Sequence, residues 1–116
     1  MRATLLAYLT EPKPSVVFDA PRPALSRAAF ARAATTRGVE LDLRTRLLYA
    51  QREVAINGDA VDTAGLDAAQ RRALRRLADC HSLAPASVRG EVLLALFYAW
   101  YGYGWVRLAI NGGWEP

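Results

Sequence analysis

Residues 47–61 read LLYAQREVAINGDAV, and this stretch decides the fold class. Two apolar runs, residues 47–49 and 53–56, flank a three-residue connection, which indicates a β-hairpin. Asn57-Gly58 follows directly, and this dipeptide favours the tight turn between antiparallel strands. The stretch therefore predicts a small antiparallel unit.

Three helices are expected around this unit. The first covers about residues 26–36, with Ser26 as its N-cap and Gly38 as its terminator. The second covers about residues 66–80 and has an apolar face opposite an arginine-rich face. The third covers about residues 88–101 and is apolar nearly all round, so we expect it to be the central buried element.

Short extended segments complete the fold. Val39, Leu41 and Leu43 alternate with acidic residues, which is typical of a half-buried strand. Residues 105–110 are expected to form a last strand, and residues 111–113 a turn. We predict an α+β domain, winged-helix-like, with three helices and a small antiparallel β-hairpin or sheet.

The expected domain comprises residues 25–116, and residues 1–24 are expected to be a linker and extended arm. Pro12 and Pro14 favour extended backbone in that arm. Residues 3–10 have the apolar composition of the end of a longer helix. We therefore expect the chain to be a piece of a longer protein rather than the product of a short gene.

The composition excludes most kinds of catalytic and metal site. The 116 residues suffice for one domain, with a net charge of +4, one cysteine and one histidine. A single cysteine rules out an intramolecular disulfide and a multi-cysteine zinc site. Cys80 and His81 are adjacent at an expected helix end, so we interpret them as structural rather than as a metal or nucleophile site. No catalytic, cofactor-binding or metal residue is assigned to the chain.

The sequence shows neither an export signal nor a membrane span. The first residues lack the apolar core of a signal peptide. Residues 92–110 approach membrane length, but Gly102, Gly104 and Arg107 interrupt them. We expect a cytoplasmic protein without membrane contact.

Four arginines share the outer face of the second helix, where they could grip phosphates: Arg71, Arg72, Arg75 and Arg76. This face is compatible with a small basic nucleic-acid-binding protein, which is the alternative functional hypothesis. The preferred interpretation is the solvated outer face of an arginine-rich amphipathic helix, on which pairing with Asp67 and Asp79 is available at helical spacing.

A series of aromatic residues marks the end of the third helix and the segment after it: Phe97, Tyr98, Trp100, Tyr101, Tyr103 and Trp105. Such spacing is typical of a core, but the series exceeds what one small core can bury. We expect part of it to meet a partner domain. The candidate interaction surface therefore comprises Arg71, Arg72, Arg75, Arg76, Tyr101, Tyr103 and Trp105.

The order of motifs resembles a known family. It begins with Glu11-Pro12-Lys13-Pro14 and LSRAAF at 25–30, continues through GVELD at 38–42 and ING at 56–58, and closes with an aromatic helix ending in Gly104-Trp105. This order is similar to that of the C-terminal, winged-helix-like region of the bacterial JmjC-type cupin ribosomal oxygenases. The resemblance implies a parent enzyme that hydroxylates an arginine of a large-subunit ribosomal protein with iron(II) and 2-oxoglutarate.

The same resemblance implies that this segment is not the enzyme. In the family, two histidines and a carboxylate of an upstream cupin barrel hold the iron, and this chain has one histidine. It implies a non-catalytic accessory domain that holds no cofactor and positions the barrel, the dimer or the substrate. The implied partners are the upstream catalytic cupin domain, a dimer partner and a ribosomal protein.

Overall fold

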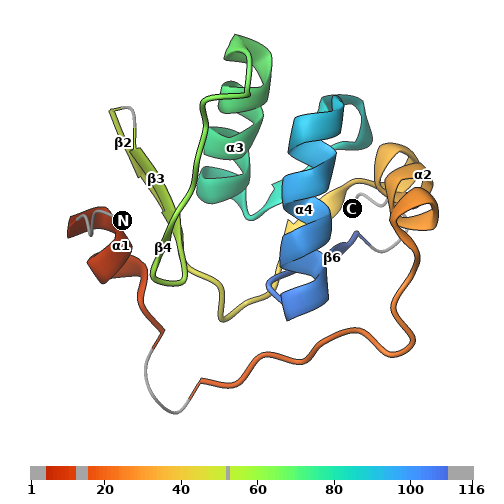
Figure 1. The fold of residues 1–116 in the computed structure, drawn as a ribbon, viewed down its shortest axis with the longest axis horizontal. Coiled ribbons are helices and arrows are strands. Elements are labelled where there is room, and N and C mark those ends of the chain that lie inside the picture. Colours follow the sequence, from red (N-terminus) through yellow and green to blue (C-terminus); the bar gives the residue numbers. More distant parts are fainter. Residues whose placement is uncertain (1–4, 13–15, 52, 110–116) are drawn as a thin grey trace.

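The computed structural model describes residues 5–12, 16–51 and 53–109. Within them the chain forms an α+β fold, as predicted (Figure 1). The elements, in chain order, are α1 (Leu5–Thr10), α2 (Arg27–Arg37), β1 (Val39–Leu41), β2 (Leu47–Ala50), β3 (Glu53–Ile56), β4 (Asp59–Ala60), α3 (Ala68–Cys80), β5 (Ser82–Leu83), the 3-10 helix η1 (Pro85–Ser87), α4 (Glu91–Tyr103) and β6 (Val106–Leu108).

The predicted hairpin is confirmed. β2, β3 and β4 form an antiparallel sheet in which Leu47 pairs with Ile56. The turn between β3 and β4 contains Asn57 and Gly58, both with positive φ, as this dipeptide favours. The Asn57 side chain accepts a hydrogen bond of 2.9 Å from the backbone N–H of Arg46, which fixes the strand that enters the hairpin.

A second antiparallel sheet has the order β5-β1-β6. β1 and β6 lie within residues 39–43 and 105–110, for which strands were expected, whereas β5 was not predicted. The prediction was also wrong for Leu43, which is 88% exposed. The alternation ends at Leu41 because the Asp42 carboxylate accepts a hydrogen bond from the backbone N–H of Arg44 and turns the chain.

Capping residues set the first and last residues of the helices. Ser26 caps α2 as predicted, since its hydroxyl accepts a hydrogen bond from the N–H of Ala29. α3 begins after Asp67, which forms a capping box with Gln70. α4 begins three residues later than predicted, because Gly90 is its N-cap with a non-helical φ of 93°, and it ends at Gly104.

The main core lies between α4 and the other helices. Leu93 and Phe97 of α4 are fully buried with Phe30 of α2 and Leu77 of α3. α4 was predicted to be the central buried element, and its Leu93, Phe97, Trp100 and Tyr101 belong to the core, while Val92 on its outer side is exposed. Figure 1 shows α4 between α2 and α3, with the hairpin on the far side of α3.

The segment 1–24, for which a linker and arm were expected, includes a packed helix. Leu6 and Ala7 of α1 bury Ala55 on the outer face of the hairpin. The buried Thr10 hydroxyl donates to the Ala7 carbonyl and accepts a hydrogen bond from the N–H of Gly58, each of 2.8 Å. Residues 16–26, hereafter the arm, contain no helix or strand and cross to α2 (Figure 1).

Candidate functional site

The structure gives the four α3 arginines different surroundings. Arg75 donates to the carbonyl of Gln51 in the hairpin at 3.3 Å, and its guanidinium lies 5.5 Å from the centroid of the Tyr49 ring. Arg71 donates at 3.4 Å to the carbonyl of Thr63, in the connection between β4 and α3. Arg75 therefore holds α3 against the hairpin, and both arginines line a hollow of about 490 Å³.

An open groove of about 720 Å³ lies between α3 and the η1–α4 segment. Arg72, Arg76 and also Arg75 line it from the α3 side, and Arg89 lines it from the η1–α4 side. We call it the α3 groove; its lining residues are Asp67, Ala69, Gln70, Arg72, Ala73, Arg75, Arg76, Asp79, Cys80, Ala86, Ser87, Arg89 and Gly90.

Arg89 is a site residue that the sequence did not indicate. Its Nε donates to the Ala86 carbonyl at 2.9 Å, and its own carbonyl accepts a hydrogen bond of 3.1 Å from the Gln70 side chain of α3. These two bonds set the position of Arg89 relative to α3. An isolated arginine in a loop carries no periodic signal, so its approach to α3 could not be predicted.

The two aspartates in the groove form no ion pair with its arginines. Asp67 caps α3, and Asp79 accepts a hydrogen bond of 3.1 Å from the Tyr49 hydroxyl, which raises the pKa of that phenol. Among the described residues, no carboxylate forms an ion pair with an α3 arginine. The interpretation that pairs these arginines with Asp67 and Asp79 was therefore wrong.

Cys80 and His81 lie at the end of α3. Cys80 is exposed and lines the α3 groove, whereas His81 ends the helix in a left-handed conformation with φ of 65°. Across residues 5–12, 16–51 and 53–109, no group of three or more histidine, cysteine, aspartate or glutamate side chains could hold a metal ion.

The aromatic part of the predicted interaction surface is divided as well. Tyr101 is buried against Phe30, with ring centroids 4.7 Å apart, and its hydroxyl accepts a hydrogen bond from the N–H of Leu25. It belongs to the core, which corrects the expectation of an exposed Tyr101. Tyr103 is 59% exposed and packs on Trp105 with a centroid distance of 4.8 Å.

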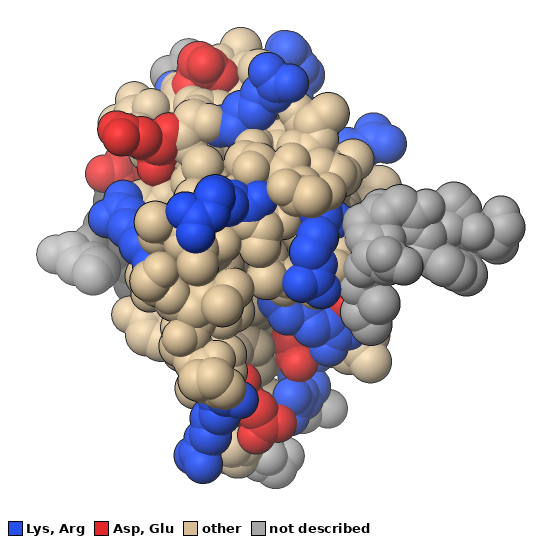
Figure 2. Space-filling model, turned by 90° about the vertical axis from the view of Figure 1, so that its right-hand side faces the viewer, with Lys and Arg blue, Asp and Glu red and all other residues tan. Residues whose placement is uncertain are grey.

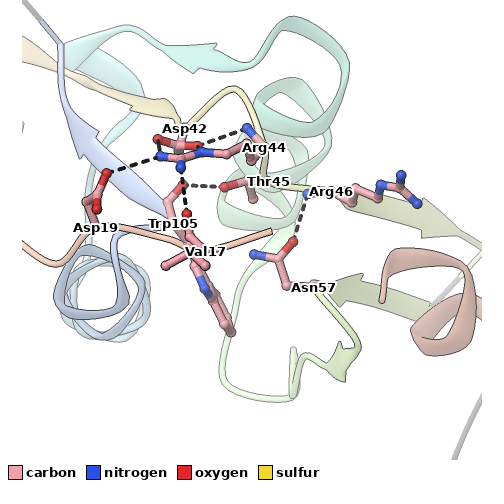
Figure 3. Close-up of polar contacts among 8 residues, drawn as sticks. All are labelled: Val17, Asp19, Asp42, Arg44, Thr45, Arg46, Asn57 and Trp105. Atoms are coloured by element: carbon pink, nitrogen blue, oxygen red, sulfur yellow. Dashed lines mark hydrogen bonds and ion pairs between the residues drawn. The ribbon is translucent and has the colours of Figure 1, made fainter. Parts of the chain in front are cut away.

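Arg44 attaches the arm to the domain (Figure 3). Its guanidinium donates two hydrogen bonds to Asp42, of 2.9 and 3.0 Å, and another to the carbonyl of Val17 in the arm. Asp19, also in the arm, lies 3.6 Å from the same guanidinium. One side chain thus links the β1–β2 connection to two residues of the arm.

Aromatic side chains also hold the arm on the domain. The Phe18 ring lies beneath Arg44, 5.6 Å from the guanidinium carbon, and meets Trp105 edge-on with a centroid distance of 6.3 Å. The Trp105 carbonyl accepts a hydrogen bond of 2.8 Å from the Thr45 hydroxyl (Figure 3). Trp105 therefore contacts the arm of its own chain, and sequence reasoning missed this contact.

Acid should weaken this attachment. Hydrogen bonds from Arg44 lower the pKa of Asp42 below its ordinary value of 3.8. The Asp42 carboxylate therefore binds a proton more readily in the unfolded chain than in the folded chain. The stabilisation of the fold by ionised Asp42 is complete above the unfolded pKa and is lost as the pH falls through the lower pKa of the folded chain. We expect the urea midpoints at pH 6 and pH 3 to differ less in Asp42→Asn than in the unmodified chain. Equal pH dependence in both proteins would contradict this.

The helices, the hairpin and the two small antiparallel sheets define a winged-helix-like α+β domain. A family model described as the ROXA-like winged helix matches residues 1–107, and the chain belongs to this family. The resemblance noted in the sequence is thereby confirmed. No curated protein matches the chain.

Solved structures of Escherichia coli YcfD share the fold. One X-ray structure matches with a TM-score of 0.71 and 20% identity, over 88% of this chain and 27% of YcfD. A second, described as a ribosomal oxygenase, matches with a TM-score of 0.69 and 21% identity, over 89% and 29%. The chain thus matches less than a third of the length of these structures. In its described part, no helix is both long and apolar enough to cross a bilayer.

Proposed function

We propose that the chain is a non-catalytic accessory domain of a cytoplasmic JmjC cupin-type iron(II) and 2-oxoglutarate oxygenase that acts on a ribosomal protein. It positions the catalytic barrel, the dimer or the substrate. The observation that carries the proposal is the family match over residues 1–107. YcfD supports it, because a described ribosomal oxygenase contains the same fold as one part of a longer chain.

The chemistry of the side chains supports a non-catalytic role. The iron of this oxygenase class needs two histidines and a carboxylate, and this chain has one histidine. His81 serves as the C-cap of α3, and no metal-holding cluster occurs in the described part. The residues present do not fit the iron, so no step of the hydroxylation is assigned to them.

α1 offers a surface for docking within such an enzyme. Its inner residues pack on the hairpin, while Leu5, Tyr8 and Leu9 are 72%, 67% and 50% exposed. A helix that is apolar on both sides is typical of an element covered on both sides. We assign this outer face to contact with the catalytic domain or the dimer partner.

The size of the native protein tests the proposal. An antibody to this chain should detect, in the source cells, a protein several times heavier than 12.7 kDa. A band at 12.7 kDa would contradict membership of a larger oxygenase.

Deletion then tests the positioning role. Removing this segment from the heavier protein is expected to lower kcat/KM for the ribosomal protein and to leave iron binding intact, because no iron ligand is removed. Unchanged hydroxylation, or loss of the iron, would contradict the accessory role.

A further inference from the structure

Two arginines of the α3 groove are free to bind a ligand. Arg72 and Arg76 are exposed and lie four residues apart, so their side chains are neighbours on the helix surface. Neither makes a hydrogen bond or an ion pair with any described residue, in contrast to Arg44 and Arg107, whose guanidinium groups bind carboxylates.

Arg89 brings a third guanidinium to the same groove from another element. Its Nε is occupied by the Ala86 carbonyl, and its two terminal nitrogens have no described partner. The bond from Gln70 to the Arg89 carbonyl fixes this side of the groove relative to α3. Three arginines, two from α3 and one from the η1–α4 connection, therefore line one open groove.

The α3 groove carries an excess of positive charge. Four arginines and two aspartates line it, and the aspartates accept hydrogen bonds from Gln70 and Tyr49. On the side of the molecule that Figure 2 shows, basic and acidic side chains are both spread over the surface. The excess of arginine over aspartate makes the groove a positively charged site.

The shape and lining of the groove indicate the ligand. Guanidinium forks match phosphate oxygens, and an open groove suits a polymer better than an enclosed small molecule. The lining contains no aromatic residue on which an unpaired base could stack, so contact is with the backbone of a duplex.

We propose that the α3 groove binds the phosphate backbone of double-helical RNA through Arg72, Arg76 and Arg89, without reading bases. The choice of RNA over DNA rests on the proposed function, in which the parent enzyme acts on a ribosomal protein. The choice of the groove rests on its arginines alone. Arg71 and Arg75 have a different role, because Arg71 binds the carbonyl of Thr63 and Arg75 binds the hairpin.

Fluorescence anisotropy of a labelled RNA duplex with the 116-residue chain tests this. The double variant Arg72→Gln/Arg76→Gln removes two phosphate contacts and no contact within the chain. We expect weaker binding, with the slope of log affinity against log salt reduced by about 0.9 per lost contact. Arg27→Gln/Arg32→Gln, on the exposed side of α2, removes the same charge elsewhere and should leave the slope unchanged.

Three outcomes would overturn the proposal: no RNA binding at low salt, an equal slope change in the α2 control, or a DNA duplex bound at least as tightly as the RNA. These outcomes are independent of the native size of the protein. A 12.7 kDa band in cells would contradict the oxygenase assignment and would leave the measured binding to the groove standing.

The single cysteine allows the bound RNA to be located. Cys80 is exposed and lines the α3 groove, so a photo-crosslinker attached to its thiol should join the RNA. The matched control is Cys80→Ser/Arg32→Cys, which places the crosslinker on α2. Crosslinking of equal yield from both positions would overturn the assignment to the groove.

Discussion

Phe30→Ala is expected to destabilise the domain by about 3–5 kcal/mol, the range for a large aromatic residue removed from a core. The Phe30 ring is fully buried, and its centroid lies 5.5 Å from that of Tyr98 and 4.7 Å from that of Tyr101. These contacts join α2 to α4, so the cavity would open between the two helices. Thermal unfolding followed by circular dichroism should show a decrease in Tm of more than about 10 °C.

Leu43→Ala is the matched control for this truncation. Leu43 is 88% exposed, so its removal should change the free energy of unfolding by less than about 0.5 kcal/mol. Comparable losses in the two variants would contradict the burial of Phe30 and the placement of Leu43 outside the core.

Gly104→Ala is expected to release the arm and to destabilise the fold by about 1–3 kcal/mol. Gly104 has φ of 83°, and a Cβ at this position would lie 2.4 Å from the carbonyl oxygen of Asp19. That oxygen belongs to the backbone, so the clash is relieved only if the arm moves. Faster amide hydrogen exchange in residues 16–20, together with changed tryptophan fluorescence from Trp105, would report the release.

Gly102→Ala is the control at the neighbouring glycine. Gly102 lies inside α4, and apart from its chain neighbours and the backbone of its own helix no atom lies within 4 Å of a Cβ placed there. Alanine should therefore stabilise the helix, by about 0.5–1 kcal/mol. A release of the arm by Gly102→Ala would show that the effect at Gly104 does not arise from contact with Asp19.

Features governed by neighbouring residues could be predicted from the sequence. The Asn57-Gly58 turn, the Ser26 cap and the ends of α2 and α4 at glycines all follow from local backbone preferences. β5 could not be predicted, because a two-residue strand carries no periodicity and forms only by pairing with β1. The exposure of Leu43 follows from a hydrogen bond made by its neighbour Asp42, which hydrophobic alternation does not register.

In the candidate site, too, only the features set by neighbouring residues could be predicted from the sequence. The arginine face of α3 is visible in the sequence because its members share one helix. Arg89 lies at the groove because its carbonyl is bonded to Gln70, 19 residues away. The bonds of Arg71 and Arg75 depend on where Thr63 and Gln51 lie in the fold. Burial of Tyr101 depends on Leu25, 76 residues away. Contacts over such separations leave no pattern in a single sequence.

α1 packs on the hairpin separately from the main core. Its apolar contact is a small cluster of Leu6, Ala7 and Ala55, and Thr10 adds a polar link to the turn. Elements with few buried contacts open at a lower free energy than the global unfolding transition. We therefore expect α1 to detach and rebind as a local unit while the main core stays folded. The exposed apolar face of α1 would then belong to a unit that opens independently of the α3 groove.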